Sequence, residues 1–191
     1  AIDLVVISHF HGDHVDGLLT ADNKPAFPNA EVLVPAVEWK FWMDGGEMSR
    51  ASGDRMVGLF KNNRRVFETG LGKKVTPYEW GKDVAPGMLA VESIGHTPGH
   101  TSYVLSSRAD KVFIQSDVTN DPDLFARNPG WHLMFDQDPV QAETTRRKIY
   151  DMISAERMRV QGFHYPFPGL ANLEKDGSGY RWIPAPWNPV I

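Results

Sequence analysis

The feature that most constrains this chain is a nearly continuous apolar run, Ile2–Ser8, that leads directly into a cluster of histidines and aspartates. Such a run predicts a β-strand covered on both faces, as in the centre of a sheet. The segment that follows, S-H-F-H-G-D-H-V-D-G, holds three of the seven histidines of the chain. A strand is therefore predicted to end in a polar cluster, which is where a rigid scaffold presents functional groups.

The spacing within the cluster favours a metal site. His9, His11 and Asp13 lie two residues apart, so in an extended segment all three side chains point to one face. A turn at Gly12–His14 would bring His14 beside them. Imidazole nitrogens and carboxylate oxygens suit zinc and similar divalent ions. The alternative is a set of ordinary polar loop residues with capping or solvent roles, but four such residues at this spacing favour metal ligation.

The rest of the chain mixes predicted strands with predicted helices. Short apolar runs bounded by Gly, Pro, Asp and Ser predict further strands at Glu31–Val34, Val75–Tyr78, Met88–Ile94, Thr101–Ser106, Lys111–Gln115 and Arg159–Phe163. Helical signals predict a short turn at Val15–Leu19, a helix after Pro35 and a long helix from Asp138 or Pro139 to Glu156. Arg50–Lys61 fits either a helix or a surface excursion, and the proline-rich tail Tyr180–Ile191 is unsuited to a central strand. This mixture indicates a layered α/β fold.

Composition limits the class of protein. With 191 residues, 41% of them hydrophobic, the chain can bury one sizeable core, and we expect a single domain over residues 1–191. A formal net charge of −4 argues against a nucleic acid as partner, because nucleic-acid binding usually needs a basic face. No apolar run reaches the roughly 20 residues that cross a bilayer. The chain has no cysteine, which excludes disulfides and thiolate ligands. We therefore expect a small-molecule substrate, no nucleic acid and no membrane, with a homodimer left open.

Four motifs, taken together, resemble those of the metallo-β-lactamase superfamily. H-F-H-G-D-H-V-D-G is similar to the first motif of that family, and G-H-T-P-G-H-T (Gly95–Thr101) is similar to the third. I-Q-S-D-V-T resembles the strand end that carries a metal-bridging aspartate, and G-F-H-Y-P-F-P-G resembles the last motif. The resemblance implies an α/β fold of the four-layer αββα type, with a metal site along one edge of its sheets. Family members usually have further strands and a helix before the first motif, so we expect that part of the N-terminal strands is missing.

The resemblance also implies a dinuclear metal site. One ion would be held by His9, His11, His96 and Asp117, and the other by Asp13, His14, His164 and the same Asp117. Zinc is the expected metal, with iron, manganese and cobalt as alternatives. A hydroxide bridging the two ions would be the nucleophile. Asp13 and Asp117 are the implied catalytic residues, Asp117 as the bridge and Asp13 as a group that hands on a proton.

Within this family, the ligands favour a hydrolase that is not a true β-lactamase. The best-known β-lactamase subclasses resemble this chain at the first motif but carry a cysteine where Asp117 stands. The implied reaction is cleavage of an ester, lactone or phosphotriester bond. The segments around His164 and Phe41–Trp42 look most like those of methyl parathion hydrolase and its relatives. Alternatives are a lactonase for quorum signals, an iron-dependent oxidoreductase and a non-catalytic, metal-stabilised binding protein. Export of similar proteins favours a periplasmic or secreted location.

Several other side chains are candidates for supporting roles. His100, just past a Pro-Gly turn, is expected to hydrogen-bond within the site rather than bind a metal. The candidates for a substrate pocket are Phe41, Trp42, Trp131 and His132, and the alternative for each is a structural role in the core. Asp136, Asp138 and Arg146 are expected to form a salt-bridged brace near the start of the long helix.

Overall fold

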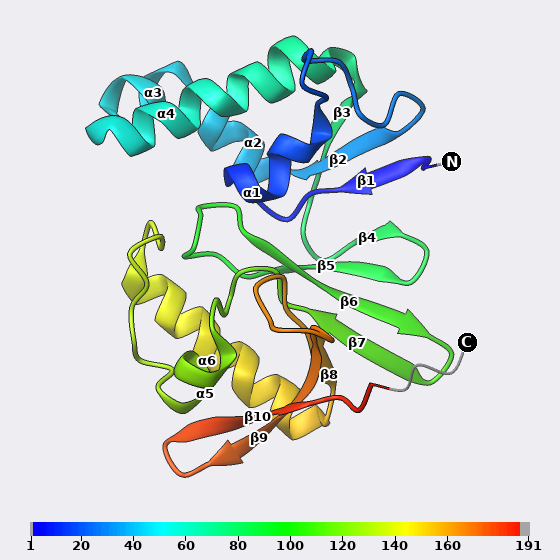
Figure 1. Ribbon diagram of the computed structural model, residues 1–191, viewed down its shortest axis with the longest axis vertical. Helices are drawn as coiled ribbons and strands as arrows, with labels where there is room; N and C mark the ends of the chain where they lie inside the picture. The colour runs from blue at the N-terminus through cyan, green and yellow to red at the C-terminus, as the bar shows by residue number, and fades with distance from the viewer. Residues whose placement is uncertain (1, 188–191) are drawn as a thin grey trace. The chain divides into compact units, whose positions relative to one another are not determined.

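The structure is a computed structural model that describes residues 2–187. It comprises two compact parts (Figure 1): unit 1 is Ala1–Trp80 with Thr97–His100, and unit 2 is Gly81–His96 with Thr101–Ile191. Each unit has its own sheet and its own hydrophobic core. The predicted metal ligands are divided between the units, because the first motif lies in unit 1 whereas His96, Asp117 and His164 lie in unit 2.

Unit 1 is built on three parallel strands in the order β1-β2-β3. These strands are β1 (Leu4–Val6), β2 (Glu31–Pro35) and β3 (Val75–Tyr78). The first strand is shorter than the predicted Ile2–Ser8 because its pairing with β2 covers only Leu4 to Val6, although Ile7 N still donates to Leu33 O at 2.9 Å. The chain leaves β1 at the carboxyl edge of this parallel sheet, and His9 follows at once.

The connection from β2 to β3 is helical. Helix α2 (Ala36–Met43) begins directly after Pro35, which confirms the helix predicted there. Helix α3 (Gly45–Arg50) is capped by Asp44, whose Oδ1 accepts a hydrogen bond from Glu47 N at 2.8 Å. The segment Arg50–Lys61 belongs mostly to helix α4 (Gly53–Arg64) rather than to a surface excursion. The chain continues through a π-helix, η2 (Arg65–Leu71), and a 3-10 turn, η3 (Gly72–Lys74).

Aromatic side chains dominate the core of unit 1. Phe10 and Phe67 are fully buried and stack with ring centroids 4.0 Å apart. Trp42 and Phe60 are buried as well, with centroids 4.7 Å apart. Such pairs add to the burial of large apolar surfaces. Phe10 stands between His9 and His11 in the sequence, so the packing of its ring into the core anchors the backbone that carries both histidines.

Unit 2 contains a sheet of seven strands in the order β10-β9-β8-β7-β6-β5-β4. The strands are β4 (Asp83–Ala85), β5 (Met88–Glu92), β6 (Thr101–Ser107), β7 (Asp110–Ile114), β8 (Arg159–Gln161), β9 (Leu170–Asp176) and β10 (Gly179–Pro184). All neighbours are antiparallel except β7 and β8. Because these two strands are parallel, the segments that follow them emerge at the same edge of the sheet (Figure 1). Asp117 follows β7 and His164 follows β8.

The hairpin of β9 and β10 was not predicted. The segment is rich in Gly and Pro, which does not suggest strands. Its side chains nevertheless pack inward, and Leu173 and Tyr180 are buried in the core of unit 2. The strands turn at Gly177, whose φ of +58° suits glycine. β10 is the edge strand, which agrees with the expectation that the tail from Tyr180 supplies no central strand. Residues 188–191 of that tail lie outside the described residues.

The long helix α6 (Pro139–Glu156) matches its prediction. Asp138 caps it, since its Oδ1 accepts from Gln141 N at 2.9 Å, and Pro139 occupies the first turn. Ile149 and Ile153 are buried in the core of unit 2. A shorter helix, α5 (Pro122–Arg127), was not predicted. Among residues 2–187, no helix combines the length and the apolar character that a bilayer span requires.

Candidate functional site

Three histidine rings gather where β1 ends in unit 1. His9 and His11 are buried. Helix α1 (Gly12–Val15) carries Asp13 and His14, and the 3-10 turn η1 (Asp16–Leu18) continues it. The helical segment begins three residues before the predicted turn at Val15–Leu19. The ring centroid of His9 lies 4.9 Å from that of His11 and 4.1 Å from that of His14. The structure therefore brings the imidazoles of the first motif together, as their spacing predicted.

Short local contacts hold this arrangement. His14 N donates to His11 O at 3.0 Å, which closes the turn into α1. Ser8 Oγ lies 3.1 Å from His9 Nδ1, a contact that restrains the ring. Asp13 Oδ2 lies 3.5 Å from His14 Nε2, and the Asp13 side chain is 50% exposed, so solvent reaches this carboxylate.

A buried carboxylate, Glu38, contacts the backbone of the same motif. Its Oε1 accepts a hydrogen bond from Phe10 N at 2.9 Å, and the residue is fully buried. Burial raises the pKa of the Glu38 carboxyl, whereas its hydrogen bonds lower that pKa. Glu38 is not among the predicted site residues, and its signal in the sequence is an acidic residue within the largely apolar and aromatic segment V-E-W-K-F-W-M.

His100 also lies in unit 1, beside the histidine cluster. It is fully buried, and its ring centroid is 4.9 Å from that of His9. His100 N donates to Thr97 O at 3.4 Å within the Thr97–His100 turn. Its role as a supporting group rather than a ligand stays a prediction.

Unit 2 gathers its three predicted ligands around one carboxylate oxygen. Asp117 Oδ2 lies 3.0 Å from His164 Nε2 and 3.5 Å from His96 Nε2. Asp117 and His96 are buried, and the His164 side chain is 30% exposed. Asp117 and His164 meet because β7 and β8 are parallel neighbours, and His96 arrives from the loop after β5. A buried carboxylate is costly without such partners.

A second buried carboxylate, Asp136, orients His96. Asp136 Oδ1 lies 2.8 Å from His96 Nδ1, and both side chains are buried. Arg146 pairs with Asp136 at 3.4 Å, which confirms this part of the predicted brace. Arg146 also donates to the backbone oxygens of Val118, Pro129 and Trp131 at 2.8–2.9 Å. Asp138 takes a different role, because it caps α6.

The donor set suits divalent metals of the zinc type. The candidate ligands are His9, His11, Asp13 and His14 in unit 1 and His96, Asp117 and His164 in unit 2. Imidazole and carboxylate are donors that zinc, iron, manganese and cobalt accept. Asp136 Oδ1 accepts a hydrogen bond from Nδ1–H of His96, so Nε2 of this ring keeps its lone pair for a metal. The residue types present therefore fit a site for divalent metal ions.

The predicted pocket residues occupy different surroundings. Trp42 lies in the core of unit 1, where its Nε1 donates to Glu38 Oε1 at 2.9 Å. Phe41 lines a cavity of about 270 Å³ in unit 1, together with Val37 and Pro98. In unit 2, Trp131 is 52% exposed and His132 Nε2 lies 2.8 Å from Glu143 Oε2 on α6. Their roles toward a substrate stay predictions.

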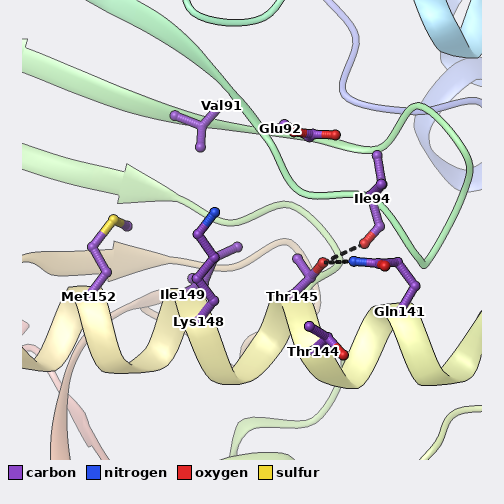
Figure 2. A pocket seen from close by; sticks show the side chains of 9 residues that line it. All are labelled: Val91, Glu92, Ile94, Gln141, Thr144, Thr145, Lys148, Ile149 and Met152. Carbon is purple, nitrogen blue, oxygen red and sulfur yellow. Dashed lines mark hydrogen bonds between the residues drawn. The ribbon is translucent and has the colours of Figure 1, made fainter.

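A larger cavity of about 380 Å³ lies in unit 2 between α6 and β5 (Figure 2). Its apolar walls include Val91, Ile149 and Met152. Thr145, one of the lining residues on α6, is hydrogen-bonded to Ile94 and Gln141 (Figure 2). Its Oγ1 donates to Ile94 O at 2.7 Å and accepts from Gln141 Nε2 at 3.2 Å. The lining, as far as the described residues define it, includes none of the predicted metal ligands. The cavity is therefore separate from the candidate ligand clusters.

Comparison with known proteins identifies relatives of this chain. The family described as the metallo-beta-lactamase superfamily matches residues 1–160. A curated relative, the anti-Pycsar protein Apyc1 of Paenibacillus sp. (strain J14), is 31% identical over 134 residues, which cover 66% of this chain and 50% of that protein. The chain thus spans about half the length of this relative.

Two solved structures resemble the chain over nearly its whole length. The hydrolase AbOPH of the beta-lactamase superfamily has a TM-score of 0.90 and 27% identity, covering 97% of this chain and 65% of that one. The dizinc quorum-quenching lactonase AidC, in complex with a product, has a TM-score of 0.88 and 25% identity, with the same coverage. These similarities confirm the α/β fold class that the motifs indicated.

Proposed function

The chain belongs to the metallo-beta-lactamase superfamily, and from this membership we propose that it is a metal-dependent hydrolase that binds two divalent ions through histidine and aspartate ligands. The observation that carries the proposal is the position of Asp117, whose Oδ2 lies within 3.5 Å of a nitrogen of both His96 and His164. A carboxylate placed between imidazoles from separate strand ends has the chemistry of a shared metal ligand. We propose zinc as the metal, in keeping with the dizinc lactonase that the chain resembles.

The residues of the site have separable tasks in this proposal. Divalent ions, when bound, would lower the pKa of water toward neutrality and polarise a carbonyl or phosphoryl oxygen. Asp136 holds the proton on Nδ1 of His96 and thereby aims Nε2 of that ring at the metal site. Asp13, half exposed at the start of α1, is placed to pass a proton to solvent, which we propose as its catalytic role. No protein side chain is required as a nucleophile.

We propose a neutral lactone, ester or phosphotriester as the substrate. The similarity to AbOPH and to the lactonase AidC supports this range. The absence of cysteine also supports it, because the best-known β-lactamase subclasses carry one at the position of Asp117. The finer resemblance to methyl parathion hydrolase stays a prediction. A small molecule is the proposed partner, and we propose neither nucleic acid nor membrane.

The test combines metal analysis with a panel of substrates. The purified chain is quantified for bound metal, stripped with a chelator and reloaded with Zn²⁺. It is then assayed on an N-acyl homoserine lactone, an aryl ester, a thioester and a phosphotriester, with a cephalosporin as the negative control. We expect two metals per chain and hydrolysis that disappears with the chelator and returns with zinc. Full turnover by the stripped protein would overturn the proposal, and oxygen consumption by an iron-loaded sample without hydrolysis would favour the oxidoreductase.

A further inference from the structure

We infer that Glu38 is a positioning residue that ties the backbones of two metal-binding motifs together, an inference that rests on the proposed function. Its Oε1 accepts from Phe10 N at 2.9 Å. Its Oε2 accepts from Gly99 N at 2.7 Å and from Thr97 Oγ1 at 3.0 Å. Phe10 separates the ligands His9 and His11, and Thr97 directly follows the ligand His96 in the chain. One carboxylate thus holds residues that lie within three positions of three predicted ligands, His9, His11 and His96.

The hydrogen bonds of Glu38 match an ionised carboxylate. Trp42 Nε1 adds a second donor to Oε1 at 2.9 Å, so each oxygen receives two hydrogen bonds. Glu38, Thr97 and Phe10 are all fully buried. An ionised carboxylate only accepts, and it satisfies all of these donors at once. A neutral side chain of the same shape cannot do so, because it must present a donor at one of the two oxygen positions.

Gly99 provides a second, independent sign that the third motif is seated against α2. A Cβ at this position would lie 2.2 Å from Glu38 N and 2.6 Å from Glu38 Cα. Any side chain would therefore collide with the backbone of the helix, and only glycine permits so close an approach. The turn Thr97–His100 is fixed to α2 both by hydrogen bonds and by close packing.

This arrangement has a consequence for metal binding. A ligand set that must be ordered when the metal arrives binds more weakly than one that is already held in place. Glu38 fixes the positions of the ligands through hydrogen bonds to nearby backbone groups, and it does not need to contact the ion. Groups that orient metal ligands in this way typically change metal affinity about 10–100-fold when they are replaced. Replacing Glu38 should therefore weaken metal binding without changing which atoms bind the metal.

The test substitutes Glu38→Gln and measures zinc affinity directly. Chelator-stripped protein is titrated with Zn²⁺ against a chromogenic competitor, and Co²⁺ absorption spectra report the ligands. We expect Glu38→Gln to weaken zinc binding about 10–100-fold with unchanged Co²⁺ bands. The matched control is Phe60→Leu, which alters the same core but contacts neither motif backbone through hydrogen bonds, and we expect it to stay within about threefold of the wild type.

The outcomes separate this inference from the proposed function. Zinc binding by folded Glu38→Gln equal to that of the wild type, or Co²⁺ bands that shift because a ligand is lost, would overturn the positioning role alone. A wild-type chain that binds no zinc would overturn the proposed function and this inference with it. If Glu38→Gln does not fold, Thr97→Val replaces it, because this variant keeps the shape and removes one donor to Oε2. Several-fold weaker zinc binding by Thr97→Val supports the inference, and an unchanged affinity overturns it.

Discussion

Asp136 Oδ1 and His96 Nδ1 lie 2.8 Å apart, and both side chains are almost completely buried. Because a carboxylate can only accept, this contact places the proton on Nδ1 and leaves Nε2 of His96 as the metal-binding nitrogen. Arg146 balances the charge of Asp136 from its other side. The three residues form a buried chain of contacts from α6 to a predicted metal ligand.

Replacing Asp136 by Asn should weaken metal binding. The side-chain amide of this variant would present its oxygen less strongly to His96, and its amino group would face Arg146 or the ring. We expect zinc affinity to fall about 10–100-fold, as for other partners of metal-binding histidines. Competitive Zn²⁺ titration measures the change. Asp138→Asn is the control, because Asp138 caps α6 and Asn is also a good capping residue. An equal loss of zinc affinity in Asp136→Asn and Asp138→Asn would argue against a specific role for Asp136.

Replacing Arg146 by Met should destabilise the fold. The guanidinium is buried, and its loss leaves Asp136 without its cationic partner and three backbone oxygens without their donor. Removing one partner of a buried pair costs about 3–5 kcal/mol. The free energy of unfolding from urea denaturation measures this loss. Arg147→Met is the matched control, because the Arg147–Glu143 pair is exposed and such pairs contribute about 0–1 kcal/mol.

Hydrolysis should require Asp117. Asp117→Asn keeps the size of the side chain but removes the negative charge that the proposed site needs, so we expect kcat/KM to fall at least about 100-fold. The folded state is checked by circular dichroism. Asp151→Asn serves as the control, since Asp151 on α6 is exposed and pairs with Lys175 on β9. Near wild-type turnover by Asp117→Asn would contradict the assigned role.

The stability of unit 2 should depend on pH through Glu143. The hydrogen bonds from His132 and then from Arg147 hold the pKa of the Glu143 carboxyl below its ordinary value. A carboxyl of this kind adds stability that is present above its unfolded pKa, about 4.3, and that is lost as the pH falls through the folded pKa. We expect the wild type to lose more stability than Glu143→Gln on acidification from neutral pH through this range. Urea midpoints at each pH test this expectation, and the difference should shrink in high salt because the pairs are exposed.

Much of the candidate site was readable from the sequence because its chemistry is local. His9, His11, Asp13 and His14 fall within six residues, and the three imidazole rings lie close together where a strand leads into a short helix. The long helix and most strands were readable for the same reason, since caps and apolar periodicity act over a few residues. The hairpin of β9 and β10 could not be predicted in this way, because its strands are defined by the packing of their side chains into the core of unit 2.

The sequence alone determined which residue types can bind a metal and in what order they occur along the chain. Only the tertiary structure decided which other residues hydrogen-bond to these candidate ligands and to the backbone around them. Glu38 meets Phe10 and Gly99 from 28 and 61 residues away, and Asp136 meets His96 from 40 residues away. No local pattern encodes these partners, because a buried carboxylate is satisfied by donors that only the folded chain brings within reach.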